Sequence, residues 1–304
     1  MASPLLGLPG GRQSELDRGA VFFVGTATTV IRLGGFTILT DPNFLHAGDH
    51  AHLGYGMTSR RLTEPAIDVR GLPPLDLCVL SHLHGDHWDH VAADRLRKDL
   101  TIVTTPQAAR GLRDQGFVRT RPLERWQYAT FVKGAVHLKI TAMPGRHGPP
   151  LVSRLLPSVM GSMLEWSGAD GICRFRLYLS GDTRLHRRLV EIPRRFPRVD
   201  LALLHLGGMR LLGILVTMDA RQGVRALRLL RPAAAIPIHH DDYPIFRSSL
   251  RDFLVAVDKA GMEPLVHTLR RGEAYEFTVP ARAGEGASGR IAAITADATP
   301  APPG

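Results

Sequence analysis

One short segment of the chain crowds together side chains that bind metals. It reads Ser-His-Leu-His-Gly-Asp-His-Trp-Asp-His over residues 81–90 and directly follows the apolar run 75–80. The first two histidines are two positions apart, so on an extended backbone their side chains point to the same side. The glycine after them permits a tight turn, and the Asp-His pair then approaches from a second direction. Because imidazole and carboxylate suit zinc and similar divalent metals, the segment predicts a metal site with four ligands: His82, His84, Asp86 and His87.

This motif resembles that of the metallo-β-lactamase superfamily. In that family the ligands lie on loops at strand ends of an αβ/βα sandwich, and a lone His, a Gly-Asp-Thr-like Asp and a final His follow the first motif. The chain contains Pro-Gly-Arg-His, Ser-Gly-Asp-Thr and Pro-Ile-His-His in that order, each after an expected strand. The resemblance covers about residues 20–280. It implies three further ligands: His147, Asp182 and His239.

The resemblance also implies a role for each ligand. One metal would be held by His82, His84 and His147. A second would be held by Asp86, His87 and His239, with Asp182 bridging the two. The ions, Zn²⁺ first with Mn²⁺ or Fe²⁺ as alternatives, would lie about 3.5–4 Å apart and share a hydroxide that acts as the nucleophile. In this prediction the catalytic residues are Asp86 and Asp182.

Two of these ligands have an alternative in the sequence itself. Asp182 also stands where a helix over 184–196 would take its N-cap, so a capping role competes with the metal role. His240 adjoins His239, and at a strand end only one of two adjacent side chains faces the site. The resemblance favours His239, the residue right after the apolar strand.

Other residues are candidates for supporting roles. Asp41, in Leu-Thr-Asp-Pro, would orient a ligand histidine by a hydrogen bond, or would only open a turn before the proline. The apolar segment 148–171 is either a lid or a packed excursion. Candidate substrate-binding residues are His52, His240 and Tyr243, with the loop around His52 equally readable as solvated surface. We expect no site role for five histidines that stand outside the ligand pattern: His90, His137, His186, His205 and His267.

The apolar runs and their breakers predict the elements that position these residues. Two β-rich runs flank Gly-Gly and predict a hairpin over 28–40. Strands are expected at 21–24, 75–80, 101–105, 129–131, 135–142, 174–180, 199–205, 233–238 and 273–279. Helices are expected at 91–100, 106–115, 184–196, 218–230 and 249–260. The alternation predicts the α/β class, and with the resemblance a four-layer αβ/βα sandwich of two mixed sheets covered by helices.

Length and composition fit one such domain. The chain has 304 residues, 44% of them apolar, which is enough for a large core. We expect a hydrolase domain over 20–280 between a flexible N-terminal tail, 1–19, and a disordered Ala/Pro-rich C-terminal tail, 281–304. The first twenty residues lack the order of a signal peptide, and no 18-residue apolar run occurs. These patterns predict a soluble, cytoplasmic protein.

The net charge of +10 raises the question of a nucleic-acid partner. The basic residues are 34 arginines and four lysines spread along the chain, with groups at 184–198 and 221–231 on expected helices. Such faces are usually solvated, so we expect no nucleic-acid partner. Positive potential would instead draw a small anionic substrate to the metals. A homo-oligomer is compatible with the sequence.

The details of the motifs narrow the resemblance to one branch. Gly-Thr-Ala-Thr at 25–28, Leu-Thr-Asp-Pro at 39–42 and Pro-Ile-His at 237–239 are similar to the branch of ascorbate-6-phosphate lactonase and N-acylphosphatidylethanolamine phospholipase D. This implies a metal-dependent hydrolase that cleaves a phosphodiester or a lactone of a small-molecule or lipid-like substrate. The alternatives are a metal-dependent nuclease and a metal-binding regulatory protein without turnover.

Overall fold

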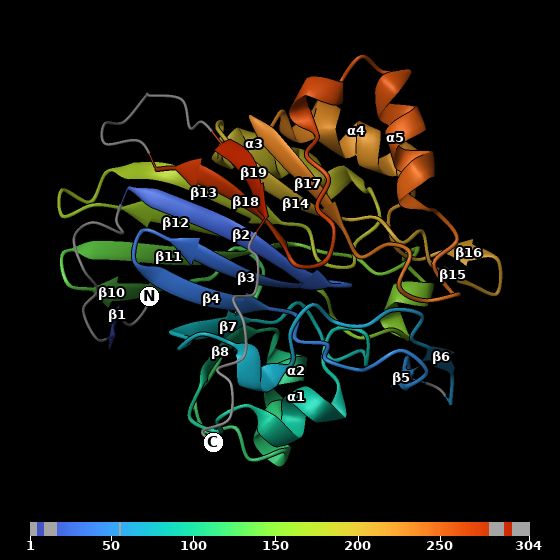
Figure 1. Cartoon of the computed structure of the whole chain (residues 1–304), viewed down its shortest axis with the longest axis horizontal. Coiled ribbons are helices and arrows are strands. Elements are labelled where there is room, and N and C mark those ends of the chain that lie inside the picture. Colours follow the sequence, from blue (N-terminus) through green and yellow to red (C-terminus); the bar gives the residue numbers. More distant parts are fainter. Residues whose placement is uncertain (1–4, 9–16, 55, 280–288, 294–304) are drawn as a thin grey trace, which may run out of the picture.

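Two β-sheets packed face to face form the centre of the protein (Figure 1). The computed structural model describes residues 5–8, 17–54, 56–279 and 289–293. Helices α1 (His90–Arg95) and α2 (Pro106–Asp114) lie beside strands β7 (Leu77–Val79) and β8 (Thr101–Thr104) (Figure 1). On the opposite side, helices α3 (Glu191–Arg195), α4 (Ala220–Leu230) and α5 (Leu250–Asp258) lie beside β14 (Leu201–His205) and β17 (Ala234–Ile238) (Figure 1). The layer order is helix, sheet, sheet, helix, so the predicted four-layer α/β sandwich is confirmed.

The first sheet has the strand order β1-β10-β11-β12-β13-β14-β17. Its strands are β1 (Leu5–Leu8), β10 (Tyr128–Lys133), β11 (Val136–Pro144), β12 (Met160–Ser167), β13 (Cys173–Leu179), β14 (Leu201–His205) and β17 (Ala234–Ile238). The strands from β10 to β13 are antiparallel neighbours, whereas β13, β14 and β17 run parallel. As a result β11, β13, β14 and β17 all end at the same edge.

The second sheet has the strand order β19-β18-β2-β3-β4-β7-β8-β9. Its strands are β2 (Arg18–Gly25), β3 (Thr28–Leu33), β4 (Phe36–Thr40), β7 (Leu77–Val79), β8 (Thr101–Thr104), β9 (Thr120–Pro122), β18 (Glu273–Thr278) and β19 (Gly289–Ala293). Strands β4, β7 and β8 are parallel, so they also share one edge at their carboxyl ends. The predicted Gly-Gly hairpin is the antiparallel pair β3 and β4.

Helices and short hairpins complete the chain. The helices are α1 (His90–Arg95), α2 (Pro106–Asp114), α3 (Glu191–Arg195), α4 (Ala220–Leu230) and α5 (Leu250–Asp258). Single turns of 3-10 helix occur at Val69–Gly71, Val152–Arg154, Arg187–Val190 and Glu263–Leu265. Two small hairpins pair β5 (His50–His52) with β6 (Thr58–Arg60) and β15 (Arg210–Leu211) with β16 (Ile214–Leu215). No helix in these ranges is both long and apolar enough to cross a membrane.

The main core fills the space between the two sheets. Inward side chains of both sheets, among them Ile31, Leu138, Leu164 and Ile236, are completely buried there. Burying such side chains removes apolar surface from water, which contributes about 1.5–3 kcal/mol for each one. Two further clusters fasten the helices to the outer faces of the sheets. The edge where the strands end is thereby held rigid from both sides.

For the segment 148–171 the sequence allowed two forms, a lid or a packed excursion, and residues 160–167 do not form a lid. Residues 160–167 are strand β12, in the middle of the first sheet, and nearly all of its residues are buried. A strand covered on both faces is apolar without alternation, so its sequence lacks the period that marks a half-buried strand. The packed alternative is therefore the correct one for this part of the segment.

The predicted helix over 184–196 is also wrong in its first part. Arg184 and Leu185 are non-helical, a 3-10 turn follows, and only Glu191–Arg195 is α-helix. The backbone N–H of Arg184 donates to the carbonyl of Arg146 (3.0 Å), and that of Leu185 donates to Gln222 Oε1 (2.6 Å). These tertiary hydrogen bonds replace the bonds of a first helical turn.

The predicted tails fall largely on residues outside the described ranges. Within 1–19, the structure places β1, parallel to β10, and the start of β2. Within 281–304 it places β19, antiparallel to β18. The two short strands are edge strands of their sheets, and the boundaries of the domain and its tails stay a prediction.

Candidate metal centre

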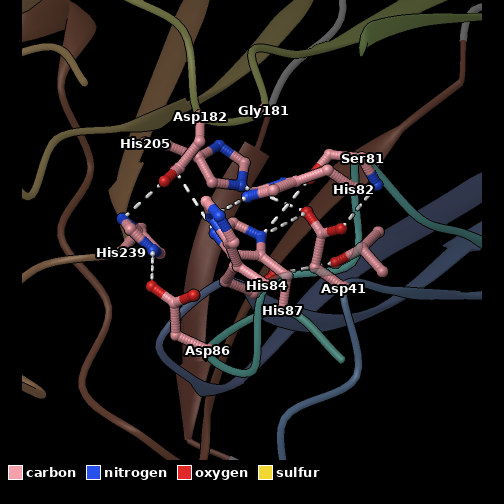
Figure 2. Close-up of polar contacts among 12 residues, drawn as sticks. Asp41, Ser81, His82, His84, Asp86, His87, Gly181, Asp182, His205 and His239 are labelled. Carbon is pink, nitrogen blue, oxygen red and sulfur yellow. Dashed lines mark hydrogen bonds and ion pairs between the residues drawn. The ribbon is translucent and has the colours of Figure 1, made fainter. Parts of the chain in front are cut away.

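The seven predicted metal ligands lie together at the shared edge of the two sheets, in two groups. Figure 2 labels all of them except His147. In each group the ligand atoms are within 4.8 Å of one another, and every side chain is buried. The first group consists of His82, His84 and His147. The second group consists of Asp86, His87, Asp182 and His239.

The ligands come from both sheets. The motif at 81–90 lies between β7 and α1 in the second sheet, and the other three ligands follow β11, β13 and β17 of the first sheet. Each of these strands ends at the same edge, so four segments far apart in the sequence converge there. Each predicted ligand stands after the end of a strand in the sequence. The topology of the two sheets brings these strand ends to one edge and so brings the predicted ligands together.

The first group is made of three imidazoles. His82 Nε2 and His84 Nδ1 are 2.9 Å apart, and His82 Nδ1 lies 2.9 Å from Ser81 Oγ. His147 Nδ1 donates to the carbonyl of Val216 (3.1 Å), which leaves its Nε2 without a partner among the described residues. A hydrogen bond on one ring nitrogen orients the other, as in histidines that bind metals.

The second group is centred on Asp182. Its Oδ1 lies 3.3 Å from His87 Nε2 and 3.4 Å from His239 Nδ1, and Asp86 Oδ2 lies 3.3 Å from His239 Nε2. The N-cap alternative for Asp182 is wrong, because no helix begins there and the cap position of the following 3-10 turn is His186. The structure thus places Asp182 among the candidate ligands.

His239, not His240, belongs to the cluster. The backbone of His239 is left-handed (φ +59°) and its N–H donates to the carbonyl of Thr26 (2.6 Å), so the chain turns sharply after β17. This turn leaves His240 Nδ1 beside Asp241 Oδ2 (3.2 Å), outside the two groups. The strain of a left-handed non-glycine residue is typical of functional sites.

Several ligand atoms have no hydrogen-bond partner. In the described part of the chain these buried atoms are His84 Nε2, Asp86 Oδ1, His87 Nε2, His147 Nε2, His239 Nδ1 and both carboxylate oxygens of Asp182. Buried polar atoms are rarely left unsatisfied, because each costs about 1–3 kcal/mol. A set of unpartnered nitrogen and oxygen atoms that face one another fits divalent metal ions, which would satisfy them together.

The local electrostatics favour the metal-binding protonation states of His82, His84 and Asp182. Burial lowers the pKa of His84 to about 4 and that of His82 well below its ordinary value, so both are neutral near pH 7. For Asp182, burial raises the pKa, but the positive potential of His239 and His87 outweighs it and holds the pKa well below its ordinary value. Neutral imidazole and ionised carboxylate are the forms that bind metals. His87 differs, because burial lowers its pKa but the nearby carboxylates of Asp182, Asp41 and Asp86 outweigh burial and raise the pKa above its ordinary value.

Asp41 lies directly behind the second group. Its Oδ1 accepts a hydrogen bond from the backbone N–H of Ser81 (2.6 Å), and its Oδ2 lies 3.3 Å from both His87 Nδ1 and His205 Nε2. Burial raises the pKa of Asp41, but the contacts with His87 and His205 lower it by more than burial raises it. The net effect is a pKa below the ordinary value. The ionised carboxylate thus faces the Nδ1 of His87 and orients its Nε2 toward Asp182.

His205 is the residue that sequence reasoning missed. It is 1% exposed, its ring stacks on that of His87 with centroids 5.7 Å apart, and its Nδ1 lies 3.1 Å from Ser180 Oγ. With Asp41 and His87 it forms a third group of potential metal-binding atoms. A signal was present, because His205 ends a buried strand just as the predicted ligands do.

The three candidate substrate-binding residues lie outside both ligand groups. The side chain of His52 is exposed, and it is the carbonyl of His52 that accepts from the N–H of Gly85 (2.8 Å). Tyr243 is buried, and its hydroxyl donates to Asn43 Oδ1 (3.1 Å). The ring of His240 is buried beside Phe23, with centroids 6.4 Å apart. Their part in substrate binding stays a prediction.

Comparison with known proteins agrees with this arrangement. The family model described as "Beta-lactamase superfamily domain" matches residues 37–240. A "UPF0173 metal-dependent hydrolase" of Hyperthermus butylicus is 25% identical over 265 residues, which cover 85% of this chain and 100% of the relative. The Archaeoglobus fulgidus protein of the same description is 27% identical over 209 residues, covering 66% and 82%.

Solved structures share the fold. The isothiocyanate hydrolase from Delia radicum gut bacteria has a TM-score of 0.70 at 23% identity, over 84% of this chain and 98% of that one. Igni18, a metallo hydrolase from Ignicoccus hospitalis, has a TM-score of 0.63 at 22% identity, over 86% and 98%. Since the family model covers more than half of the chain, the protein belongs to the β-lactamase superfamily.

Proposed function

We propose that the protein is a metal-dependent hydrolase that cleaves an ester-like bond, a phosphodiester or a lactone, in a small anionic substrate. The observation that carries the proposal is the set of seven buried candidate ligand side chains at the shared strand edge, six of which have atoms without a hydrogen-bond partner among the described residues. The names of the relatives, "metal-dependent hydrolase", support it. The reaction type is proposed from the similarity of the motifs to the branch of ascorbate-6-phosphate lactonase and N-acylphosphatidylethanolamine phospholipase D.

The residues divide between two ions, for which we propose Zn²⁺. The first would be held by His82, His84 and His147, and the second by Asp86, His87 and His239, with Asp182 between them. Bound divalent ions supply Lewis-acid polarisation of the substrate and lower the pKa of a water at neutral pH. A cytoplasmic location is part of the same proposal.

The chain's own residues orient the groups that would hold the ions. Asp41 fixes the ring of His87, and Val216 fixes that of His147, so neither imidazole has to reorganise when the site is loaded. Asp86 Oδ1 accepts no hydrogen bond from the described residues, and the pKa of Asp86 is lowered because the positive potential of His87 outweighs the opposing effect of burial. The carboxylate is therefore ionised near pH 7, the form that would hold a metal ion.

The test combines metal analysis with an activity panel. We expect about two equivalents of transition metal per chain, as a two-metal site requires. We also expect hydrolysis of either bis(4-nitrophenyl) phosphate or an aliphatic lactone. An aryl isothiocyanate is assayed as the third substrate of the panel. His147→Ala should lose metal and activity together, because it removes one of three ligands to the first ion.

His90→Gln is the matched control. His90 belongs to the same motif but is exposed and lies outside both ligand groups, so its loss should change neither metal content nor activity. Less than one equivalent of metal in the purified protein, with the same content in His147→Ala, would contradict the proposal.

A further inference from the structure

A group of arginines lies beside the candidate metal centre. Arg146 immediately precedes His147, and Arg184 follows Asp182 by two positions. The backbone N–H of Arg146 donates to Thr183 Oγ1 (2.9 Å), and that of Arg184 donates to the carbonyl of Arg146 (3.0 Å). The backbones of the two arginines therefore lie side by side, one directly before His147 and the other two positions after Asp182.

The segment that carries Arg184 is held in place by hydrogen bonds to α4 and to the residues just before that helix. The N–H of Leu185 donates to Gln222 Oε1 on α4 (2.6 Å), and the N–H of Met218 donates to the carbonyl of Thr183 (3.0 Å). These contacts keep residues 183–185 out of the helix that the sequence predicts. Arg184 is consequently half-buried and is not part of the solvated helix face expected for 184–198.

The positive charges of this group are not neutralised by acidic side chains. In the part of the chain that the structure describes, Arg146, Arg184, Arg187 and Arg188 take part in none of the ion pairs. The Nε atoms of Arg146 and Arg184 are buried and have no hydrogen-bond partner there. The carboxylate that follows in the sequence, Glu191, already faces Arg195 (4.0 Å). Half-buried guanidinium groups without an anion are costly, which indicates that an anion belongs among them.

A buried histidine gives a second, independent observation. His186 is only 8% exposed, yet neither of its ring nitrogens has a partner among the described residues. Burial, and then the charges of Arg146 and Arg188, lower the pKa of His186 to about 4. The imidazole is thus neutral at pH 7 and can donate one N–H to a ligand placed among the arginines.

We propose that Arg146, Arg184, His186 and Arg188 form a subsite that binds a phosphoryl group of the substrate. Guanidinium groups present planar pairs of donors that match phosphate oxygens, and a phosphoryl dianion offers three strong acceptor oxygens to several cations at once. A carboxylate has one negative charge and two oxygens, so it would leave part of the group unpaired. As a substrate subsite this inference rests on the proposed hydrolase function, because it assigns the anionic part of that substrate.

The subsite is tested by calorimetric binding of two aryl anions to the metal-loaded full chain. Phenylphosphonate, which is not hydrolysed, should bind at least about tenfold more tightly than benzoate. Arg146→Gln and Arg184→Gln should each weaken phenylphosphonate binding at least about tenfold, because each removes charge-assisted hydrogen bonds. Arg146→Lys, which keeps the charge, should recover part of the affinity.

Two controls separate the subsite from the metals and from net charge, and a third subsite variant tests an exposed residue. Arg225→Gln removes the same charge from an exposed position on α4 and should leave binding unchanged. Acetohydroxamate, a metal-directed probe without a phosphoryl group, should bind the parent and the variants equally. Arg188→Gln replaces an exposed side chain, so this variant should fold like the parent. Its expected loss of phenylphosphonate affinity is therefore not caused by misfolding around a half-buried residue.

The outcomes distinguish the subsite from the function. Loss of phenylphosphonate affinity in the arginine variants, with no hydrolysis of any substrate, would support the subsite and contradict the proposed function. Hydrolysis together with unchanged phenylphosphonate affinity in Arg146→Gln, Arg184→Gln and Arg188→Gln would overturn the subsite and leave the function standing. Hydrolysis together with benzoate binding as tight as phenylphosphonate binding would do the same. Parallel binding to glycerol phosphate and to phosphatidylcholine vesicles containing phosphatidic acid identifies the source of the group, and tight binding to either supports the subsite.

Discussion

At the scale of single residues, Asp41 shows how one buried carboxylate organises its surroundings. It accepts from the backbone of Ser81, at the start of the metal-binding motif, and it lies between the rings of His87 and His205. Its own backbone is left-handed (φ +36°), directly after β4. Asp41 therefore links the end of one strand to the ligands at the end of its neighbour.

Replacing Asp41 by asparagine should weaken metal binding without removing a ligand. The amide keeps the size of the side chain but loses the negative charge that faces His87 Nδ1, so the ring loses its electrostatic anchor. Loss of such supporting partners typically costs about 10- to 100-fold in metal affinity. Competition of Asp41→Asn with a fluorescent zinc chelator measures this change. Asp114→Asn, at an exposed position on α2, is the control, and equal affinity of the two variants would contradict the role given to Asp41.

At the scale of elements, the loop after β13 is fitted tightly against β12 and the metal-binding motif. Gly181 has φ +59°, and a Cβ at this position would lie 2.6 Å from the carbonyl oxygen of Met160 and 3.1 Å from Ser81 Cβ. Only glycine permits both the left-handed backbone and this close approach. Because Asp182 is the next residue, the packing of β12 determines where this candidate ligand lies.

Gly181→Ala should therefore reduce both stability and metal content. The left-handed conformation costs an alanine about 1 kcal/mol, and the collision with the β12 backbone should add about 1–3 kcal/mol to the loss of unfolding free energy. Gly171→Ala isolates the first effect, because Gly171 has φ +72° but no atom within 4 Å of its would-be Cβ. Urea unfolding and metal analysis of both variants provide the measurement. Equal unfolding free energies would show that the loop has room to shift.

At the scale of the whole molecule, the candidate metal centre connects the two sheets. The ligands at 82–87 belong to the loop after β7 in one sheet, and those at 147, 182 and 239 to loops after strands of the other. The core between the sheets already holds them face to face. Ions bound at this edge would cross-link the two halves of the sandwich.

Removal of metal should consequently lower the melting temperature of the entire domain. Two ions at a hundred times their dissociation constants stabilise by about 5 kcal/mol together, which corresponds to a shift on the order of 10 °C for a domain of this size. Scanning calorimetry before and after dialysis against a chelator measures the shift, and added Zn²⁺ should reverse it. The same treatment should leave His147→Ala less affected, and a melting temperature independent of chelator would rule out a cross-link.

The sequence, read together with its family resemblance, predicted the fold class and the places where the candidate ligands occur. The strand ends carry their polar residues locally, and an apolar run followed by His or Asp is visible without any tertiary information, as for His239 after β17. Helix boundaries set by local caps were also predictable, as for α2, which has Thr105 as N-cap and Pro106 at its first position. These features depend on neighbours within a few residues.

Only the tertiary structure decided what depends on contacts between distant segments. Strand β12 is buried on both faces, so its sequence does not show on which side of the sheet each residue lies. His205 looks like any buried histidine until Asp41, far away in the sequence, is placed beside it. The first turn expected at Arg184 is replaced by hydrogen bonds to Arg146 and Gln222, which leave Arg184 half-buried and not on a solvated helix face. In each case the deciding partner lies in another element, and local propensity contains no information about it.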